Sequence, residues 1–271
     1  MNISAIRFAW EFILEIKSRD LNYILYIFSS ELNRLNIARG SDMKRLGMIG
    51  GGGWPSTLEY YRLLNTYYSE MKGPGHSLDL VLRNLDFVIF RELITNGQRD
   101  QALEMLVDGV NDCKNAGAEF VIFSSNALHG FLEELGSSIS LPVIHIAEAT
   151  AKVIADKGMR KVGLLGVKLT MEGKFYPDIL GKYGIETLIP NESDRGVVEQ
   201  IIFSELVIGK TSRASKEVLL EMMQRLVNKG AEGIILGCTE IPLLIKEEDT
   251  DYPQFSTTEI HCRAALQFAL E

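Results

Sequence analysis

The strongest constraint on the fold is a pattern that occurs twice in the chain. Residues 115–119, Asn-Ala-Gly-Ala-Glu, precede the apolar run 120–123 and then Ser125. Residues 228–232, Asn-Lys-Gly-Ala-Glu, precede the apolar run 233–236 and then Cys238. In both copies a helical pattern ends at a Gly-Ala-Glu turn, and a short strand leads to a polar nucleophile. The repetition predicts two related α/β halves that each present one such side chain to a shared cleft.

The rest of the chain continues this alternation of short strands and longer helices. We expect strands at residues 46–49, 78–82, 120–123, 142–146, 161–165, 186–189 and 234–236. We expect helices at residues 58–71, 100–114, 126–135, 147–157, 171–183, 195–208, 215–229 and 258–270. Such alternation is typical of parallel sheets covered on both faces. The predicted fold is therefore α/β, with two pseudo-symmetric, doubly wound parallel-sheet domains and the active site in the cleft between them.

The domain boundaries follow from the same pattern. We predict an N-terminal α/β domain at 43–141 and a C-terminal α/β domain at 142–256, with the last helix, 257–271, packing back on the first domain. Residues 1–42 contain two apolar runs that are far shorter than the roughly 20 residues needed to span a bilayer. We interpret residues 1–42 as an extension outside the core, which folds without it. The alternative is a helical arm that packs on the domain or on a second subunit.

Composition narrows the range of functions. The net charge of −8 argues against a nucleic-acid partner, which requires a basic surface. Three cysteines in 271 residues do not make a disulfide framework, and the four histidines lack the spacing of a metal site. We therefore expect a cytoplasmic protein that binds a small molecule and no metal, nucleic acid or membrane.

Two phosphate-binding motifs match only in part. Residues 50–55, Gly-Gly-Gly-Gly-Trp-Pro, follow a strand, but Pro55 stands where the third glycine of a dinucleotide-binding turn belongs. These glycines are better suited to bringing backbone N–H groups close to a small anion. Gly209-Lys-Thr211 resembles the end of a P-loop, but Ser204 replaces its first glycine and a helix precedes it.

Ser125 and Cys238 are the candidate catalytic residues. Both follow strands, at the edge of a parallel sheet where ligands bind, and both precede helical patterns. Unpaired N–H groups at a helix start are expected to hold a carboxylate and to lower the pKa of the thiol. A packing role is the alternative for Cys238, whereas Cys113 and Cys262 are expected to be structural. His129, one helical turn after Ser125, either contacts the cleft or belongs to the core.

Three segments resemble the aspartate/glutamate racemase family. They are residues 47–65, which include the glycine run and Trp54-Pro-Ser-Thr57; residues 141–150, Leu-Pro-Val-Ile-His-Ile-Ala-Glu-Ala-Thr; and residues 236–241, Leu-Gly-Cys-Thr-Glu-Ile. The resemblance extends over nearly everything after Met43. It implies two pseudo-symmetric α/β domains, no cofactor, a homodimer and a two-base mechanism. In that mechanism one side chain takes the α-proton and the other protonates the opposite face.

One position departs from the family pattern. Most members carry cysteine in a Cys-Asn-Thr-type segment where this chain has Ser125-Asn126-Ala127. Serine is the poorer acid and base, since only a thiol has a pKa, about 8.5, that its surroundings can bring toward neutrality. Relatives with a hydroxyl residue here resemble racemases that prefer one enantiomer, and relatives with a single cysteine at the second site are decarboxylases.

Residue matching to the family also implies a set of substrate contacts. Asn126 and Thr239 would offer donors to the α-carboxylate, while Arg91 is the nearest candidate for a side-chain carboxylate, with a solvated surface charge as its alternative. Thr57 is either a further contact or a helix cap. The complete substrate-binding set is Gly52, Asn126, Ala127, Thr170, Thr239 and Glu240.

The leading hypothesis is a cofactor-independent amino-acid racemase that uses Ser125 and Cys238 on a small dicarboxylic amino acid, aspartate or glutamate. One alternative is a single-thiol decarboxylase or isomerase of the same superfamily. The other is a non-catalytic binder of small carboxylates, in which Ser125 marks a lost base.

Overall fold

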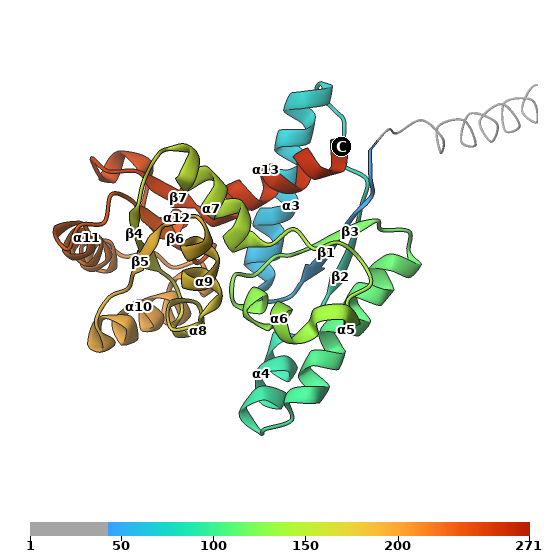
Figure 1. Cartoon of the computed structure of the whole chain (residues 1–271), viewed down its shortest axis with the longest axis horizontal. Helices are drawn as coiled ribbons and strands as arrows, with labels where there is room; N and C mark the ends of the chain where they lie inside the picture. Colours follow the sequence, from blue (N-terminus) through green and yellow to red (C-terminus); the bar gives the residue numbers. More distant parts are fainter. Residues whose placement is uncertain (1–42) are drawn as a thin grey trace, which may run out of the picture. The chain divides into compact units, whose positions relative to one another are not determined.

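The computed structural model describes residues 43–271, so the predictions for residues 1–42 lie outside the described residues. The described chain contains two parallel β-sheets, one in each half of the sequence, with helices packed around them (Figure 1). This architecture agrees with the predicted α/β fold. None of the described helices combines the length and the apolar character needed to cross a membrane.

The first sheet has three strands in the order β2-β1-β3, all parallel. Its elements are β1 (Leu46–Gly50), α3 (Trp54–Lys72), β2 (Leu80–Asn84), α4 (Phe87–Thr95), α5 (Arg99–Asn115), β3 (Phe120–Phe123), η1 (Ala127–Phe131), α6 (Leu132–Leu135) and η2 (Gly136–Ser138). The predicted helix 126–135 is thus a 3₁₀ segment followed by one α-helical turn, and the sequence analysis did not predict α4.

The strand predicted at 142–146 is wrong. Only Val143 bridges to Val121, through hydrogen bonds from Val121 N to the Pro142 carbonyl and from Ile144 N to the Val121 carbonyl. The next residue, His145, already caps a helix by accepting a hydrogen bond from Ala147 N. The chain therefore leaves the sheet edge after a single bridge.

The second sheet has four parallel strands in the order β5-β4-β6-β7. Its elements are α7 (Ile146–Asp156), β4 (Lys161–Leu165), α8 (Lys168–Met171), α9 (Phe175–Lys182), β5 (Glu186–Leu188), α10 (Glu192–Ser204), η3 (Leu206–Ile208), α11 (Arg213–Asn228), β6 (Ile234–Leu236), α12 (Ile241–Leu244), η4 (Glu247–Asp249) and β7 (Gln254–Ser256). Strand β7 was not predicted, and the predicted helices 171–183 and 195–208 are each interrupted.

The first strand of each half uses a glycine to bring a helix close. A Cβ on Gly47 would lie 2.9 Å from the Cβ of Cys113 on α5, and a Cβ on Gly163 would lie 2.9 Å from Cδ1 of Leu226 on α11. Protein interiors are packed too densely to admit such an atom without movement. Cys113 is fully buried at this contact, as expected for a structural cysteine.

The final helix, α13 (Thr257–Leu270), contacts α3 of the first half and α7 of the second (Figure 1). His261 of α13 hydrogen-bonds the Tyr60 hydroxyl on α3 at 2.9 Å and the Ile144 carbonyl at 2.7 Å. Hydrogen bonds from His261 thus hold α13 against the first half of the chain. We retain the boundaries 43–141 and 142–256 as a proposal.

Candidate active site

The glycine loop after β1, residues 51–53, lies close to both Ser125 and the carboxylate that binds Cys238. A Cβ on Gly52 would lie 2.5 Å from the Cβ of Ser125 and 2.7 Å from its hydroxyl oxygen. A Cβ on Gly53 would lie 3.6 Å from Oε1 of Glu240. The other oxygen of Glu240 accepts a hydrogen bond from the Cys238 thiol, with an Sγ–Oε2 distance of 3.0 Å. The loop therefore touches Ser125 directly and Cys238 through its carboxylate partner.

Thr57 holds this loop in place. Its hydroxyl oxygen accepts a hydrogen bond from Gly51 N at 2.9 Å and lies 3.0 Å from the Ser124 hydroxyl. Gly51 has a φ of +93°, a conformation that side chains rarely tolerate, which explains the glycine at that position. Thr57 is 5% exposed, so it supports the loop from the interior of the protein. It makes no side-chain cap at the start of α3.

A chain of hydroxyl groups joins the two halves beside Cys238. Ser56 donates to the Ser124 carbonyl at 2.7 Å, and its oxygen lies 2.7 Å from the Thr239 hydroxyl. Because Ser56 has a single hydrogen, the Thr239 hydroxyl must be the donor to Ser56. The Thr239 side chain is therefore occupied, and its backbone N–H faces the Cys238 sulfur, where it favours the thiolate.

Asn126, a predicted substrate contact, links three segments of the chain through its side chain. Its Nδ2 donates to the Thr257 hydroxyl at 3.0 Å, and its Oδ1 accepts a hydrogen bond from the Tyr176 hydroxyl at 2.7 Å. Thr257 in turn donates to the Leu236 carbonyl at 2.9 Å, at the end of β6. One amide hydrogen of Asn126 remains for a ligand.

The expected low pKa of Cys238 is wrong in direction. Burial, followed by the charge of Glu240 and the hydrogen bond to it, raises the pKa of the Cys238 thiol well above its ordinary value. The backbone N–H groups of Glu240 and Thr239 act in the opposite direction but are weaker. The following helix, α12, is only four residues long, so its dipole offers little compensation. Cys238 is consequently a protonated thiol at neutral pH.

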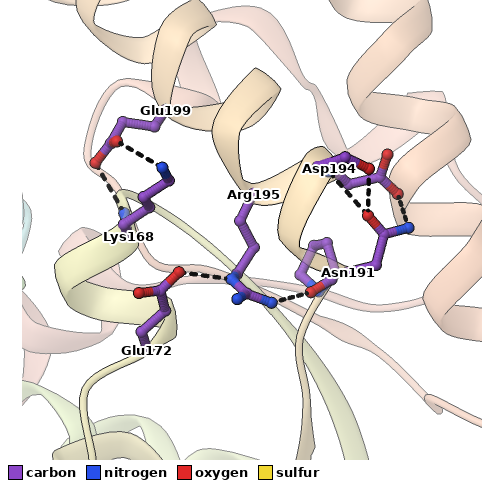
Figure 2. A network of polar contacts seen from close by, with 8 residues as sticks. Lys168, Glu172, Asn191, Asp194, Arg195 and Glu199 are labelled. Atoms are coloured by element: carbon purple, nitrogen blue, oxygen red, sulfur yellow. Dashed lines mark hydrogen bonds and ion pairs between the residues drawn. The ribbon is translucent and has the colours of Figure 1, made fainter.

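Thr170 lies beside the Cys238 strand with a free hydroxyl. It is fully buried, its Oγ1 has no partner among the described residues, and its Cγ2 packs against Gly237. Polar contacts hold its helix, α8, against α10 (Figure 2): Lys168 N donates to Glu199 at 3.1 Å, and Arg195 pairs with Glu172 at 2.8 Å. A buried hydroxyl without a partner is costly, which makes Thr170 a strong candidate ligand contact.

Other candidates lie further from the pair. His129 is buried, and its Nδ1 donates to the Ser125 carbonyl at 2.9 Å, so it supports the Ser125 backbone from the core. Arg91 is exposed on α4 and lines a cavity that Ala127 also lines. Neither Ser125 nor Cys238 lines that cavity.

The sequence analysis missed several residues that support the site: Ser56, Ser124, Tyr176 and Thr257. A weak local signal existed for two of them, because Ser56-Thr57 follows the glycine run and Thr257-Thr258 begins the last helix. Among the described residues, no group of three or more histidine, cysteine or acidic side chains is arranged to hold a metal ion.

The fold and the site define a class of protein, and comparison with known proteins agrees. The chain matches the Asp/Glu/hydantoin racemase family model over residues 49–265 and therefore belongs to that family, which confirms the resemblance. A Yersinia pestis structure classed as an Asp/Glu racemase is 39% identical, with a TM-score of 0.79 over 84% of this chain and 100% of the other.

Two further relatives carry more specific descriptions. The structure of an aspartate racemase homologue from Pyrococcus horikoshii is 33% identical, with a TM-score of 0.73 over 84% of this chain and 100% of the other. A broad-specificity amino-acid racemase of Bacillus subtilis, RacX, is 21% identical over 211 residues, which are 77% of this chain and 90% of the relative. The matches to the Yersinia pestis and Pyrococcus horikoshii structures confirm the predicted α/β fold.

Proposed function

We propose that this protein is a cofactor-independent racemase of an acidic amino acid, with Ser125 and Cys238 acting on opposite faces of the α-carbon. The observation that carries the proposal is the glycine loop, which touches Ser125 and, one residue later, the carboxylate that binds the Cys238 thiol. Membership of the racemase family supplies the class of reaction. The two descriptions that name aspartate, or aspartate and glutamate, support the substrate class.

Glu240 gives the high-pKa thiol a way to act as a base. The carboxylate can accept the thiol proton across the 3.0 Å hydrogen bond as the sulfur takes the α-proton of the substrate. The free amide hydrogen of Asn126 and the Thr170 hydroxyl are the donors for the substrate carboxylate, while the Thr239 N–H faces the Cys238 sulfur. Ser125 then delivers a proton to the other face. Because serine is a weak acid and base, we expect one direction of racemisation to be slower.

The test is α-proton exchange in D₂O. We expect the protein to incorporate deuterium at the α-carbon of L- or D-aspartate or glutamate and to invert that carbon. NMR measures the deuterium, and chiral chromatography measures the inversion. Ser125→Ala should abolish inversion while leaving exchange at Cys238, and Cys238→Ala should abolish exchange. Each loss should be at least about 10²–10⁴-fold, the usual contribution of an acid–base group. Ser137→Ala, on the exposed η2, is the matched control and should keep the wild-type rate.

An unchanged inversion rate in Ser125→Ala would contradict the two-base mechanism. The single thiol of the site favours one other candidate function, a one-base decarboxylase. That enzyme would release CO₂ from a malonate-type substrate, would depend on Cys238 and would tolerate Ser125→Ala within a few-fold. The homodimer and the cytoplasmic location remain predictions.

A further inference from the structure

A large cavity lies next to the proposed site but does not include its catalytic pair. Its volume is about 1080 Å³, and its walls come from α4, η1 and α6 of the first half and from α8, α9 and α10 of the second. Five phenylalanines line it: Phe87, Phe90, Phe131, Phe175 and Phe203. Cavities of this size and composition hold molecules larger than aspartate. Of the proposed site residues only Ala127 lines it.

The charged side chains of the cavity favour an anion. Arg91, Lys174 and Lys182 line it, and no carboxylate of the described residues is paired with any of them. Two of the four acidic side chains in the lining are neutralised, since Glu134 pairs with Arg99 and Glu199 with Lys168. Glu133 and Asp178 are the remaining two. Three available cations against two available carboxylates leave an excess of one positive charge.

His129 forms part of the inner wall of the cavity. Its Nδ1 must carry the hydrogen, because the Ser125 carbonyl 2.9 Å away can only accept. The other ring nitrogen, Nε2, is therefore an acceptor, and it is buried with no partner among the described residues. Burial lowers the pKa of His129 well below its ordinary value, so the ring stays neutral. The ring packs against the rings of Phe123, His145 and His261, so His129 supplies a neutral, rigid wall rather than a charge.

We propose that this cavity binds a small amphipathic anion with an aromatic or apolar body and one acidic group, at a site separate from the proton-transfer pair. The phenylalanines bury the body, and the side chains of Arg91, Lys174 and Lys182 hold the acidic group. The ligand acts as an effector, because it contacts the histidine that supports Ser125 and the helix α8 that carries Thr170.

The probe for this site is 8-anilinonaphthalene-1-sulfonate, which has an aromatic body, a sulfonate and one N–H. Fluorescence titration of the full chain at pH 7.5 should give saturable binding of one probe per chain. Leu169→Trp, at a half-exposed position in the lining, should fill the cavity, and Arg91→Met should remove its charge. Both should weaken binding by about tenfold or more, Leu169→Trp by occupying the space of the probe and Arg91→Met by the loss of one charge-assisted contact.

Two matched variants lie outside the cavity: Leu82→Trp on β2, a position 45% exposed, and Arg213→Met on α11. Both should bind the probe like the wild type, and all four variants should melt at similar temperatures. Equal binding by Arg91→Met and the wild type would overturn the proposal, as would equal weakening by the controls. Displacement of the probe by aspartate or glutamate would show that the cavity is the amino-acid site itself and would overturn the separate site. The experiment measures binding of the probe, so its result does not depend on whether the protein racemises an amino acid.

Discussion

At the residue scale, the chemistry of Cys238 depends on the carboxylate of Glu240. Since Glu240 raises the pKa of the thiol, Glu240→Gln should lower that pKa and increase the thiolate fraction at pH 8. Each unit of decrease gives about tenfold faster alkylation by iodoacetamide. Mass spectrometry should find the label on Cys238, while Cys113 and Cys262 remain unmodified because both are fully buried. Slower labelling in the variant would mean that Glu240 does not oppose the thiolate.

Gly52 offers a second test at this scale. A methyl group there would collide with Ser125 at 2.5 Å, and the neighbour is a Cβ on fixed backbone. Gly52→Ala should therefore displace Ser125 and lower the rate of α-proton inversion by about 10²-fold, as a misplacement of about 1 Å can. Gly181→Ala on α9, whose added Cβ would meet nothing within 4 Å, is the control for general effects of alanine. A wild-type rate in Gly52→Ala would show that the glycine loop does not position Ser125 for catalysis.

At the element scale, one hydroxyl links α9 to Asn126, the residue that precedes η1. Tyr176 is fully buried and donates to Asn126, so Tyr176→Phe leaves the Asn126 oxygen without a partner. We expect the free energy of unfolding to fall by about 1–3 kcal/mol. Urea denaturation measures it, and the slope should stay unchanged. Tyr61→Phe, at a position 47% exposed, should change stability by less than about 0.5 kcal/mol. An equal effect in both variants would contradict this link.

At the scale of the whole molecule, a cluster of three histidines couples stability to pH: His129 and His261 are buried, and His145 is partly buried. His129 lies with its ring centroid 5.0 Å from that of His145 and 5.2 Å from that of His261, which joins segments from η1, α7 and α13. Burial lowers the pKa of His145 to about 4 and that of His261 to about 4, whereas an unfolded histidine titrates near 6.5. Between these values the unfolded chain binds more protons than the folded one.

The stability these histidines provide is therefore complete above about pH 6.5 and is lost as the pH falls toward 4. Each should contribute a slope of up to about 1.4 kcal/mol per pH unit in that window. Urea denaturation at pH 7.5, 6.5, 5.5 and 4.5 measures the slope. His145→Asn keeps a helix-capping side chain and should reduce the slope, whereas His76→Asn, at an exposed position, should not. The same slope in both variants would exclude His145 as a source.

Most elements could be predicted from local patterns. The strands 120–123, 161–165 and 234–236 match β3, β4 and β6, because each is an apolar run bounded by a turn. The prediction failed where a local helix cap outweighed the apolar pattern. Residues 142–146 are as apolar as a strand, but His145 ends the pairing by capping α7. Strand β7 was missed because its sequence, Gln-Phe-Ser, has a single apolar residue, whereas β6 is the uninterrupted apolar run Ile-Ile-Leu.

The sequence by itself determined the α/β class, the family and the two polar residues that follow β3 and β6, because these depend on short apolar runs and local motifs. Only the tertiary structure decided what surrounds those residues. Ser56 and Thr239 are 183 positions apart, and Asn126 and Thr257 are 131 apart, so no local pattern encodes either pair. The tertiary structure also decided the pKa of Cys238. Its direction depends on burial and on where the Glu240 carboxylate points, and both are properties of the packed chain.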